Sequence, residues 1–294
     1  MDFDTYQQRA AKTRQTTGQN DKPIIVSLLG LAGETGELLS ESQKSIRDSD
    51  YHLLHKARIA EELGDLPWYP SDLASQFDLS LSTVAERNLT KADERWGQGK
   101  QPSTQLAFAM AFDGEFPEDE RLPRKGTAEI KEISPSPHRR IETYINGRKM
   151  GEDLADNALV EDGYRLHDVF HLACMTLLGW SPVVRRGLKI KRKSDSIIDD
   201  VQDGGRAIVI EEGVSALVFS YAIRHNMLEG VPAVDYEVLR TIKYMTSHLE
   251  VSVRTPRDWQ DAILRAYVVW RQIAVNGGGT IRFDAVERQF ELVS

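Results

Sequence analysis

Apolar residues in the first hundred positions recur at intervals of three and four, which predicts amphipathic helices. Asp4 can cap a first short helix, and Pro23 suits the start of a second. A polar break at 48–50 precedes a third helix over 51–77, and a fourth follows. We therefore expect residues 1–99 to form a domain of four helices.

The pattern then changes to the alternation of apolar and polar residues that is typical of strands. The segments TAEIKEIS (127–134) and RIETYI (140–145) both alternate in this way. Asn146 and Gly147 follow the second segment, and this dipeptide is the strongest short signal for a tight hairpin. We expect residues 100–156 to be a linker with a small antiparallel β insert.

Helical spacing returns from residue 157 and continues through most of the C-terminal half. Ser181 and Pro182 together mark a helix start, because serine caps and proline fits the first turn. NGGG at 276–279 predicts a loose tail before a last short amphipathic segment. The predicted fold class is mainly α: a four-helix bundle, a β-hairpin insert and a second helical domain over 157–294.

Composition and charge are those of an ordinary globular protein, and they argue against a membrane-spanning protein and against a nucleic-acid-binding protein. The 294 residues are 40% hydrophobic and 28% charged, and no run approaches the ~18 apolar residues of a membrane span. The polar, acidic N-terminus is unlike a signal peptide, and the single cysteine, Cys174, fits a reducing cytoplasm. The net charge of −8 argues against stable nucleic-acid binding. Binding of a small phosphorylated ligand is still compatible with this negative charge, because a divalent cation can bridge carboxylates to phosphates.

Two pairs of carboxylates lie on otherwise apolar helical segments. Glu34 and Glu37 are three residues apart and share one helix face, as do Glu62 and Asp65. The 24 residues between the pairs allow a turn and an antiparallel return, so all four carboxylates could converge. Such an oxygen-only cluster suits Mg²⁺ or Mn²⁺. Glycines beside both pairs, at 33, 36 and 64, would let the backbones approach closely.

Three segments together resemble the MazG-type all-α NTP pyrophosphohydrolases. They are GLAGETGELLSESQK, EELGDLPWY and VAERNLTKADERW, and the resemblance covers residues of about 20–96. The motif of that family is E-x-x-E, a spacer, E-x-x-D and a later N-x-x-K. The resemblance implies metal ligation by Glu34, Glu37, Glu62 and Asp65, and phosphate binding by Asn88, Lys91 and Arg95.

The resemblance also implies the reaction, which is Mg²⁺-dependent hydrolysis of an NTP or dNTP between the α and β phosphates. A monophosphate and diphosphate would result, and Glu37 or Glu34 would orient the attacking water. Pro67 and Pro70 depart from the family pattern directly after Asp65. A kink there would displace Asp65 or narrow a base pocket near Trp68.

The C-terminal half has the features of a permuted, weakened copy of the first bundle. Asp168 falls at the place of Asp65, and helices over 160–180 and 207–224 would pack antiparallel, in swapped order. The second of these helices carries Ser215 where the first bundle has a second glutamate. An internal pseudo-dimer of this kind, or a homodimer, would complete the bundle core.

A second candidate site is formed by His167, Asp168 and His171, which Glu211 and Glu212 could approach. A His-x-x-x-His pair on a helix can bind a transition metal, and adjacent His and Asp weakly resemble HD-type phosphohydrolases. More often such residues form a hydrogen-bonded core network, and we favour that interpretation slightly.

The leading interpretation is therefore a cytoplasmic, Mg²⁺-dependent nucleotide pyrophosphohydrolase. One alternative is a nucleotide-binding or interaction module without turnover, in view of the prolines after Asp65 and the serine at 215. A third is a metal phosphohydrolase centred on the two histidines. The basic run at 185–193 is expected to be a solvated face, with a phosphate-binding wall as its alternative.

Overall fold

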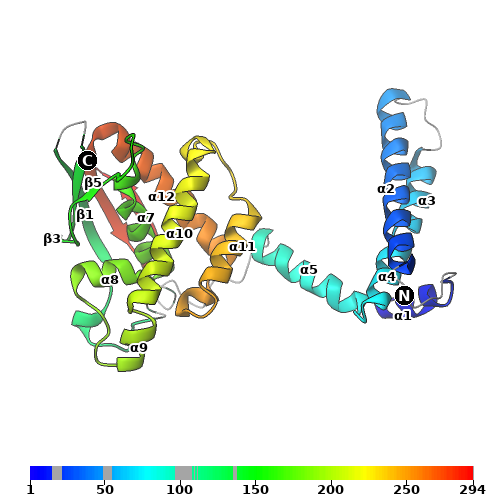
Figure 1. Ribbon diagram of the computed structural model, residues 1–294, viewed down its shortest axis with the longest axis horizontal. Helices are drawn as coiled ribbons and strands as arrows, with labels where there is room; N and C mark the ends of the chain where they lie inside the picture. Colours follow the sequence, from blue (N-terminus) through cyan, green and yellow to red (C-terminus); the bar gives the residue numbers. More distant parts are fainter. Residues whose placement is uncertain are drawn as a thin grey trace. The chain divides into compact units, whose positions relative to one another are not determined.

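The chain folds as two units, which divide between Asp93 and Glu94 (Figure 1). The first packs helices on one another, and the second packs helices against an antiparallel sheet. Helix predominates over strand in both units, which confirms the mainly α prediction. The computed structural model describes residues 1–14, 22–48, 55–96, 108, 110, 112–134 and 138–293.

The first unit is built around one long helix, α2, against which α3 and α4 pack, while α1 packs on α4. In the described part of the chain α5 does not pack along α2 or α3. The expected four-helix bundle arrangement is therefore not confirmed, although the helices themselves are present. Their bounds are α1 (Phe3–Ala11), α2 (Lys22–Asp48), α3 (His55–Asp65), α4 (Trp68–Gln76) and α5 (Leu81–Trp96).

Prolines divide the expected third helix into two. α3 ends at Asp65, and Pro67 stands immediately before α4. Proline has no backbone N–H and disfavours the helical conformation in the residue before it, so the chain turns between the two helices. α4 then packs on α2, where the ring of Tyr69 occupies the space beside Gly30. The break thus adds a packing surface directly after the carboxylate pair of α3.

Gly30 lies in close contact with the Tyr69 ring, so a residue without a side chain is required there. A Cβ atom added there would lie 2.0 Å from Cε1 of Tyr69. At Gly33, Gly36 and Gly64 nothing among the described residues lies within 4 Å of an added Cβ. The expectation that the glycines beside the carboxylates permit close backbone approach was therefore wrong for the described chain.

A Gly30→Ala substitution is expected to destabilise the first unit. The added methyl must displace the Tyr69 ring, and overpacking of this kind typically costs ~1–3 kcal/mol. Gly64→Ala is the matched control, since its methyl meets open space and alanine is the better helix former by about 1 kcal/mol. Thermal unfolding followed by circular dichroism measures both. Equal melting temperatures for Gly30→Ala and the parent would contradict the Tyr69 contact.

One segment, Pro23–Arg47 of α2, is long and apolar enough to cross a membrane, with a mean hydropathy of 1.2. Length and composition alone are weak grounds for a membrane span, because core helices of soluble proteins pass the same test. This segment also carries Glu34 and Glu37, which would be costly in a lipid interior. Only 11% of this apolar stretch is buried in the described part of the chain, so packing there leaves most of its apolar residues exposed.

The second unit contains an antiparallel sheet with strand order β3-β2-β1-β5-β6, and β4 pairs with the far end of β2. The expected strands are present, and the turn at Asn146 and Gly147 has the positive φ angles that hairpin turns favour. The bounds are β1 (Lys125–Ser134), β2 (Arg140–Ile145), β3 (Arg148–Lys149), β4 (Leu154–Ala155), β5 (Gly278–Asp284) and β6 (Gln289–Leu292).

The sheet joins segments that we expected to be separate. β1 pairs along its length with β5, from Lys125 opposite Asp284 to Lys131 opposite Gly278. The strands expected in an insert over 100–156 therefore belong to the second unit. The tail that we expected to be loose supplies two strands instead. The close pairing of β1 and β5 requires glycine at 278, because a Cβ atom there would lie 2.7 Å from the Ile130 carbonyl oxygen.

Helices of the second unit bury a large apolar core against this sheet. Trp180 and Trp259 are among its largest fully buried side chains. The expected helix over 160–180 is irregular: a 3₁₀ turn leads into α7, and a π-helical turn over Cys174–Leu178 ends it. α7 packs chiefly on α12 and also contacts α10. The permuted-copy interpretation stays a prediction. The bounds are α7 (Asp168–Ala173), α8 (Pro182–Leu188), α9 (Ser196–Val201), α10 (Gly205–Ile223), α11 (Tyr236–Met245) and α12 (Pro256–Asn276).

Two arginines of the basic run are buried, which corrects the expectation of a solvated face. Arg192 is 0% exposed and pairs with both Asp203 and Glu250, at 2.7 Å to each. Arg185 is 2% exposed and donates to Asp113 Oδ2 at 2.6 Å. Carboxylates and backbone carbonyl oxygens together occupy both guanidinium groups, so these two arginines are not available to bind phosphate.

Candidate functional site

Three carboxylates converge in the first unit where α3 packs on α2. Oxygen atoms of Glu34, Glu62 and Asp65 all lie within 4.8 Å of one another. Glu62 and Asp65 are one turn apart at the end of α3, and Glu34 faces them from the middle of α2. Glu34 and Glu62 are half-buried and Asp65 is exposed, so solvent and small ligands can reach the group.

Mutual repulsion is the main electrostatic feature of this carboxylate cluster. Partial burial and the charges of Glu37 and Glu34 raise the pKa of Glu62. Glu37 is exposed and lies outside the group of three, but its charge acts on Glu62. Converging carboxylates without a basic partner are typical of a site that binds a divalent cation, and an oxygen-only donor set suits Mg²⁺ or Mn²⁺.

Tyr69 contributes to the cluster, although sequence reasoning missed it. Its hydroxyl group donates to Glu34 Oε1 at 3.2 Å. Burial, followed by the hydrogen bond to Glu34, raises the pKa of Tyr69, so its phenol stays protonated and can hold the carboxylate in place. The proline-induced break before α4 brings this ring to Glu34. Trp68, proposed to line a base pocket, donates instead from Nε1 to Thr13 Oγ1 at 2.8 Å.

The residues expected to bind phosphate are on α5. Asn88 and Lys91 are exposed, and Leu81 is the buried residue of the described part of this helix. Arg95 also lies on α5, but its side chain is outside the described residues. The structure therefore brings together three of the four predicted metal ligands but does not pack the phosphate-binding helix against them.

The pKa of Glu62 in the metal-free protein is expected to lie above the ordinary glutamate range. Glu37→Gln removes one of the charges that raise this pKa and should lower it, whereas Glu86→Gln on α5 should leave it unchanged. NMR of the side-chain carboxyl carbon against pH measures the value. Cation affinity should fall as pH drops through this pKa, because protonated Glu62 is a poor ligand. An ordinary pKa that does not respond to Glu37→Gln would contradict the clustering.

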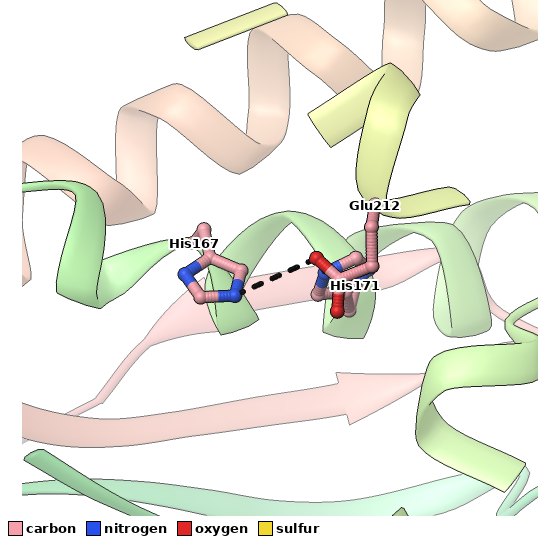
Figure 2. A group of neighbouring side chains, drawn as sticks. All are labelled: His167, His171 and Glu212. Atoms are coloured by element: carbon pink, nitrogen blue, oxygen red, sulfur yellow. Dashed lines mark ion pairs between the residues drawn. The ribbon is translucent and has the colours of Figure 1, made fainter. Parts of the chain in front are cut away.

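The second predicted cluster is assembled in the other unit, between α7 and α10. His167 immediately precedes α7 and His171 lies one turn along it, while Glu212 extends from α10 (Figure 2). Glu212 Oε2 is 3.4 Å from His171 Nε2 and 3.8 Å from His167 Nε2. His171 is fully buried, whereas the Glu212 side chain is 42% exposed.

Glu211, the neighbour of Glu212, holds His171 from the other side. It is 0% exposed and accepts hydrogen bonds from His171 Nδ1 at 2.8 Å, Ser181 Oγ at 2.7 Å and the Val183 amide at 2.8 Å. Burial alone would lower the pKa of His171, but the two glutamates outweigh it and raise that pKa to about 10. The two carboxylates thus favour a positive charge on or beside this imidazole.

Asp168, which we had grouped with the histidines, is also buried. Burial raises its pKa, opposed by the charges of His167 and His171. It is not a member of the group whose ligand atoms converge, which consists of His167, His171 and Glu212. Cys174 is buried and its thiol pKa is raised by burial, so it is a core residue and not a nucleophile.

The family comparison bears on the second unit. Residues 107–294 match the family described as the MazG C-terminal domain. The chain is also similar to the Gene 37 protein of Mycobacterium phage L5, with 39% identity over 105 residues, which are 34% of this chain and 92% of that protein. No solved structure matches the chain.

Proposed function

The chain belongs to the MazG C-terminal domain family, and from this premise we propose that it is a divalent-metal-dependent nucleotide pyrophosphohydrolase. It would convert an NTP or dNTP and water to a monophosphate and diphosphate, by cleavage between the α and β phosphates. The observation that carries this proposal is the convergence of Glu34, Glu62 and Asp65 within 4.8 Å at a solvent-accessible place.

The donor set fits the metal that this reaction requires. Carboxylate oxygens are the ligands that Mg²⁺ and Mn²⁺ prefer, and Mg²⁺ is typically held by one or two carboxylates, water and substrate phosphates. Glu34, Glu62 and Asp65 would hold the ion, with Glu37 at the edge of the site. A bound divalent cation would offset phosphate charge and make the attacking water more acidic.

The chain's own residues would then position the reactants. Glu37 is exposed beside the cluster, so its carboxylate can accept a proton from the attacking water. Tyr69 keeps Glu34 oriented through the phenol hydrogen bond. Asn88, Lys91 and Arg95 would bind phosphate oxygens when α5, from this chain or a second copy, closes over the carboxylates.

A homodimer is the proposed way to complete the first unit. Large apolar side chains are exposed on α2, α3 and α5, including Leu29 at 68%, Leu63 at 50% and Leu89 at 63%. Apolar residues gathered on adjacent elements mark an interaction surface. An internal pseudo-dimer would cover them within one chain instead. Analytical ultracentrifugation of the full chain distinguishes the two arrangements, because a homodimer has twice the mass of the chain.

The activity test is a panel of NTPs, dNTPs and alarmones with Mg²⁺ or Mn²⁺, with the products resolved by chromatography. The expected products are a nucleoside monophosphate and diphosphate, and no product should form with EDTA. Release of a nucleoside diphosphate and orthophosphate would place the cleavage at the wrong bond. The panel also identifies the preferred base and sugar, for which the sequence has no signature.

A nucleotide-binding module without turnover is the second candidate function. It is favoured by one observation, that α5 with Asn88 and Lys91 does not pack along the carboxylate helices in the described chain. Calorimetry with the same nucleotides separates the two candidates. Metal-dependent binding without product would support the binding module, and product formation would support the enzyme.

A further inference from the structure

We propose that the second unit contains a binding site for a zinc-class divalent cation, formed by His167 Nε2, His171 Nε2 and Glu212 Oε2. This site is separate from the carboxylate cluster of the first unit and does not depend on the proposed hydrolysis. It would add a nitrogen-rich metal centre to the domain that the family match covers.

The geometry of the three ligand atoms suits such an ion. Bonds of about 2.0–2.1 Å in a tetrahedral zinc site separate neighbouring ligand atoms by roughly 3.3–3.4 Å. Glu212 Oε2 lies 3.4 Å from one imidazole nitrogen and 3.8 Å from the other, and all three atoms lie within 4.8 Å of one another. Small side-chain rotations are sufficient to close this arrangement on a cation.

The rings are held by neighbours that leave their metal-facing atoms free. Tyr164 stacks on the His167 ring with centroids 4.5 Å apart and planes inclined by 11°. His167 Nδ1 bonds to the Tyr164 carbonyl oxygen at 2.7 Å, which directs Nε2 toward Glu212. In metal sites a histidine usually donates its other ring N–H to a carbonyl or carboxylate in this way.

His171 provides a second, independent indication of a ligand. Its side chain is 0% exposed, and among the described residues its Nε2 atom makes no hydrogen bond of good geometry. The neighbour that faces this atom is Glu212 Oε2 at 3.4 Å, which is itself one of the proposed ligand atoms. A buried polar atom without a partner is costly, and in native proteins it often marks an unseen water or ion. Glu211 binds Nδ1 of the same ring and is itself saturated, so it orients the imidazole and adds negative charge behind it.

The donor set selects the class of cation. Two imidazole nitrogens and one carboxylate favour zinc and neighbouring transition metals, whereas Mg²⁺ and Ca²⁺ prefer oxygen. Three protein ligands leave the fourth position of a tetrahedral zinc ion open, as in catalytic zinc sites. Access is available from the side of Glu212, whose side chain is 42% exposed.

The test is calorimetric titration of the full, EDTA-treated chain with Zn²⁺, together with Co²⁺ as a spectroscopic probe. We expect about one Zn²⁺ per chain at this site and visible Co²⁺ absorption bands of a four- or five-coordinate complex. His167→Gln and Glu212→Gln should each weaken Zn²⁺ binding at least ~10-fold and abolish the Co²⁺ bands. The Glu212 side chain is 42% exposed, so Glu212→Gln should fold, and circular dichroism checks that His167→Gln, at a side chain only 11% exposed, keeps its helices.

His225→Gln is the matched control, because His225 lies in the same unit and bonds to the Tyr221 carbonyl oxygen, outside the cluster. A double variant of the first unit, Glu34→Gln with Asp65→Asn, should also retain Zn²⁺ binding and the Co²⁺ bands. The proposal is overturned if the parent binds no Zn²⁺, or if His167→Gln and Glu212→Gln bind it as the parent does. Because the double variant lacks the carboxylate cluster, its retention of Zn²⁺ binding would show that the zinc site does not depend on the proposed hydrolase site.

Discussion

Replacement of Glu62 by glutamine is expected to reduce kcat/KM for NTP hydrolysis by about 100-fold or more. Such a loss corresponds to ~2.7 kcal/mol of transition-state stabilisation, which is within the several kcal/mol that metal ions contribute. Glutamine keeps the size of the side chain but removes one of the three converging charges, the other two being those of Glu34 and Asp65. Steady-state release of diphosphate at saturating Mg²⁺ measures the effect.

Glu61→Gln is the matched control for this variant. Glu61 is adjacent on α3, but it is exposed and pairs with Arg58 at 3.4 Å, so its substitution should change kcat/KM less than 3-fold, or less than ~0.7 kcal/mol. Circular dichroism checks that both proteins keep their helices. If Glu62→Gln and Glu61→Gln hydrolyse NTPs equally well, the carboxylate cluster is not the active site.

The second large effect is expected from Arg192→Met in the other unit. The guanidinium group lies between Asp203 and Glu250 and is 0% exposed, so methionine would remove the cation that both carboxylates bond. Asp203 would keep only its longer pair with Arg185, at 3.5 Å. Breaking a buried ion pair in this way typically costs about 3–5 kcal/mol. Urea unfolding followed by tryptophan fluorescence should show the midpoint fall accordingly.

Lys193→Met is the comparison, because Lys193 is the next residue and is exposed. Its substitution should change the free energy of unfolding by no more than about 0.5 kcal/mol. Equal midpoints for Arg192→Met and Lys193→Met would show that the buried network does not stabilise the second unit. Since Glu250 lies 58 residues from Arg192, the network also ties the loop after α11 to the basic segment.

Local periodicity predicted the helices and the first strands well, because their apolar faces repeat within one element. The same reasoning missed β5, because the glycines at 278 and 279 are typical of a loop. Here glycine permits a close approach to the Ile130 carbonyl, and the pairing that stabilises the strand comes from far along the chain. Pairing of this kind leaves little trace in local sequence.

The burial of Arg185 and Arg192 was unpredictable for a related reason. A basic run is normally solvated. Here ion pairs with the distant carboxylates Asp113, Asp203 and Glu250 offset the desolvation cost of burying the two arginines. No short-range pattern links these positions, because each arginine is separated from its carboxylate partners by 11 to 72 residues.

For the candidate sites, the sequence predicted which residues share a face of one helix, but it did not predict most contacts between helices. Glu62 and Asp65 share a face because they are one turn apart, and the antiparallel return to Glu34 followed from the length between them. Tyr69 could not be assigned, because its place depends on how α4 turns after the prolines. Glu211 and Glu212 were candidates, but their different tasks, bonding Nδ1 and facing Nε2, depend on the packing of α10.

The pairing of β1 with β5 has a consequence for biosynthesis. Lys125 and Asp284 are neighbours in the sheet, although most of the second unit lies between them in sequence. During translation β1 emerges long before its partner, so one of its edges stays unsatisfied until Gly278–Asp284 has left the ribosome. Contacts of such long range slow folding, and the nascent unit must meanwhile avoid aggregation through that edge.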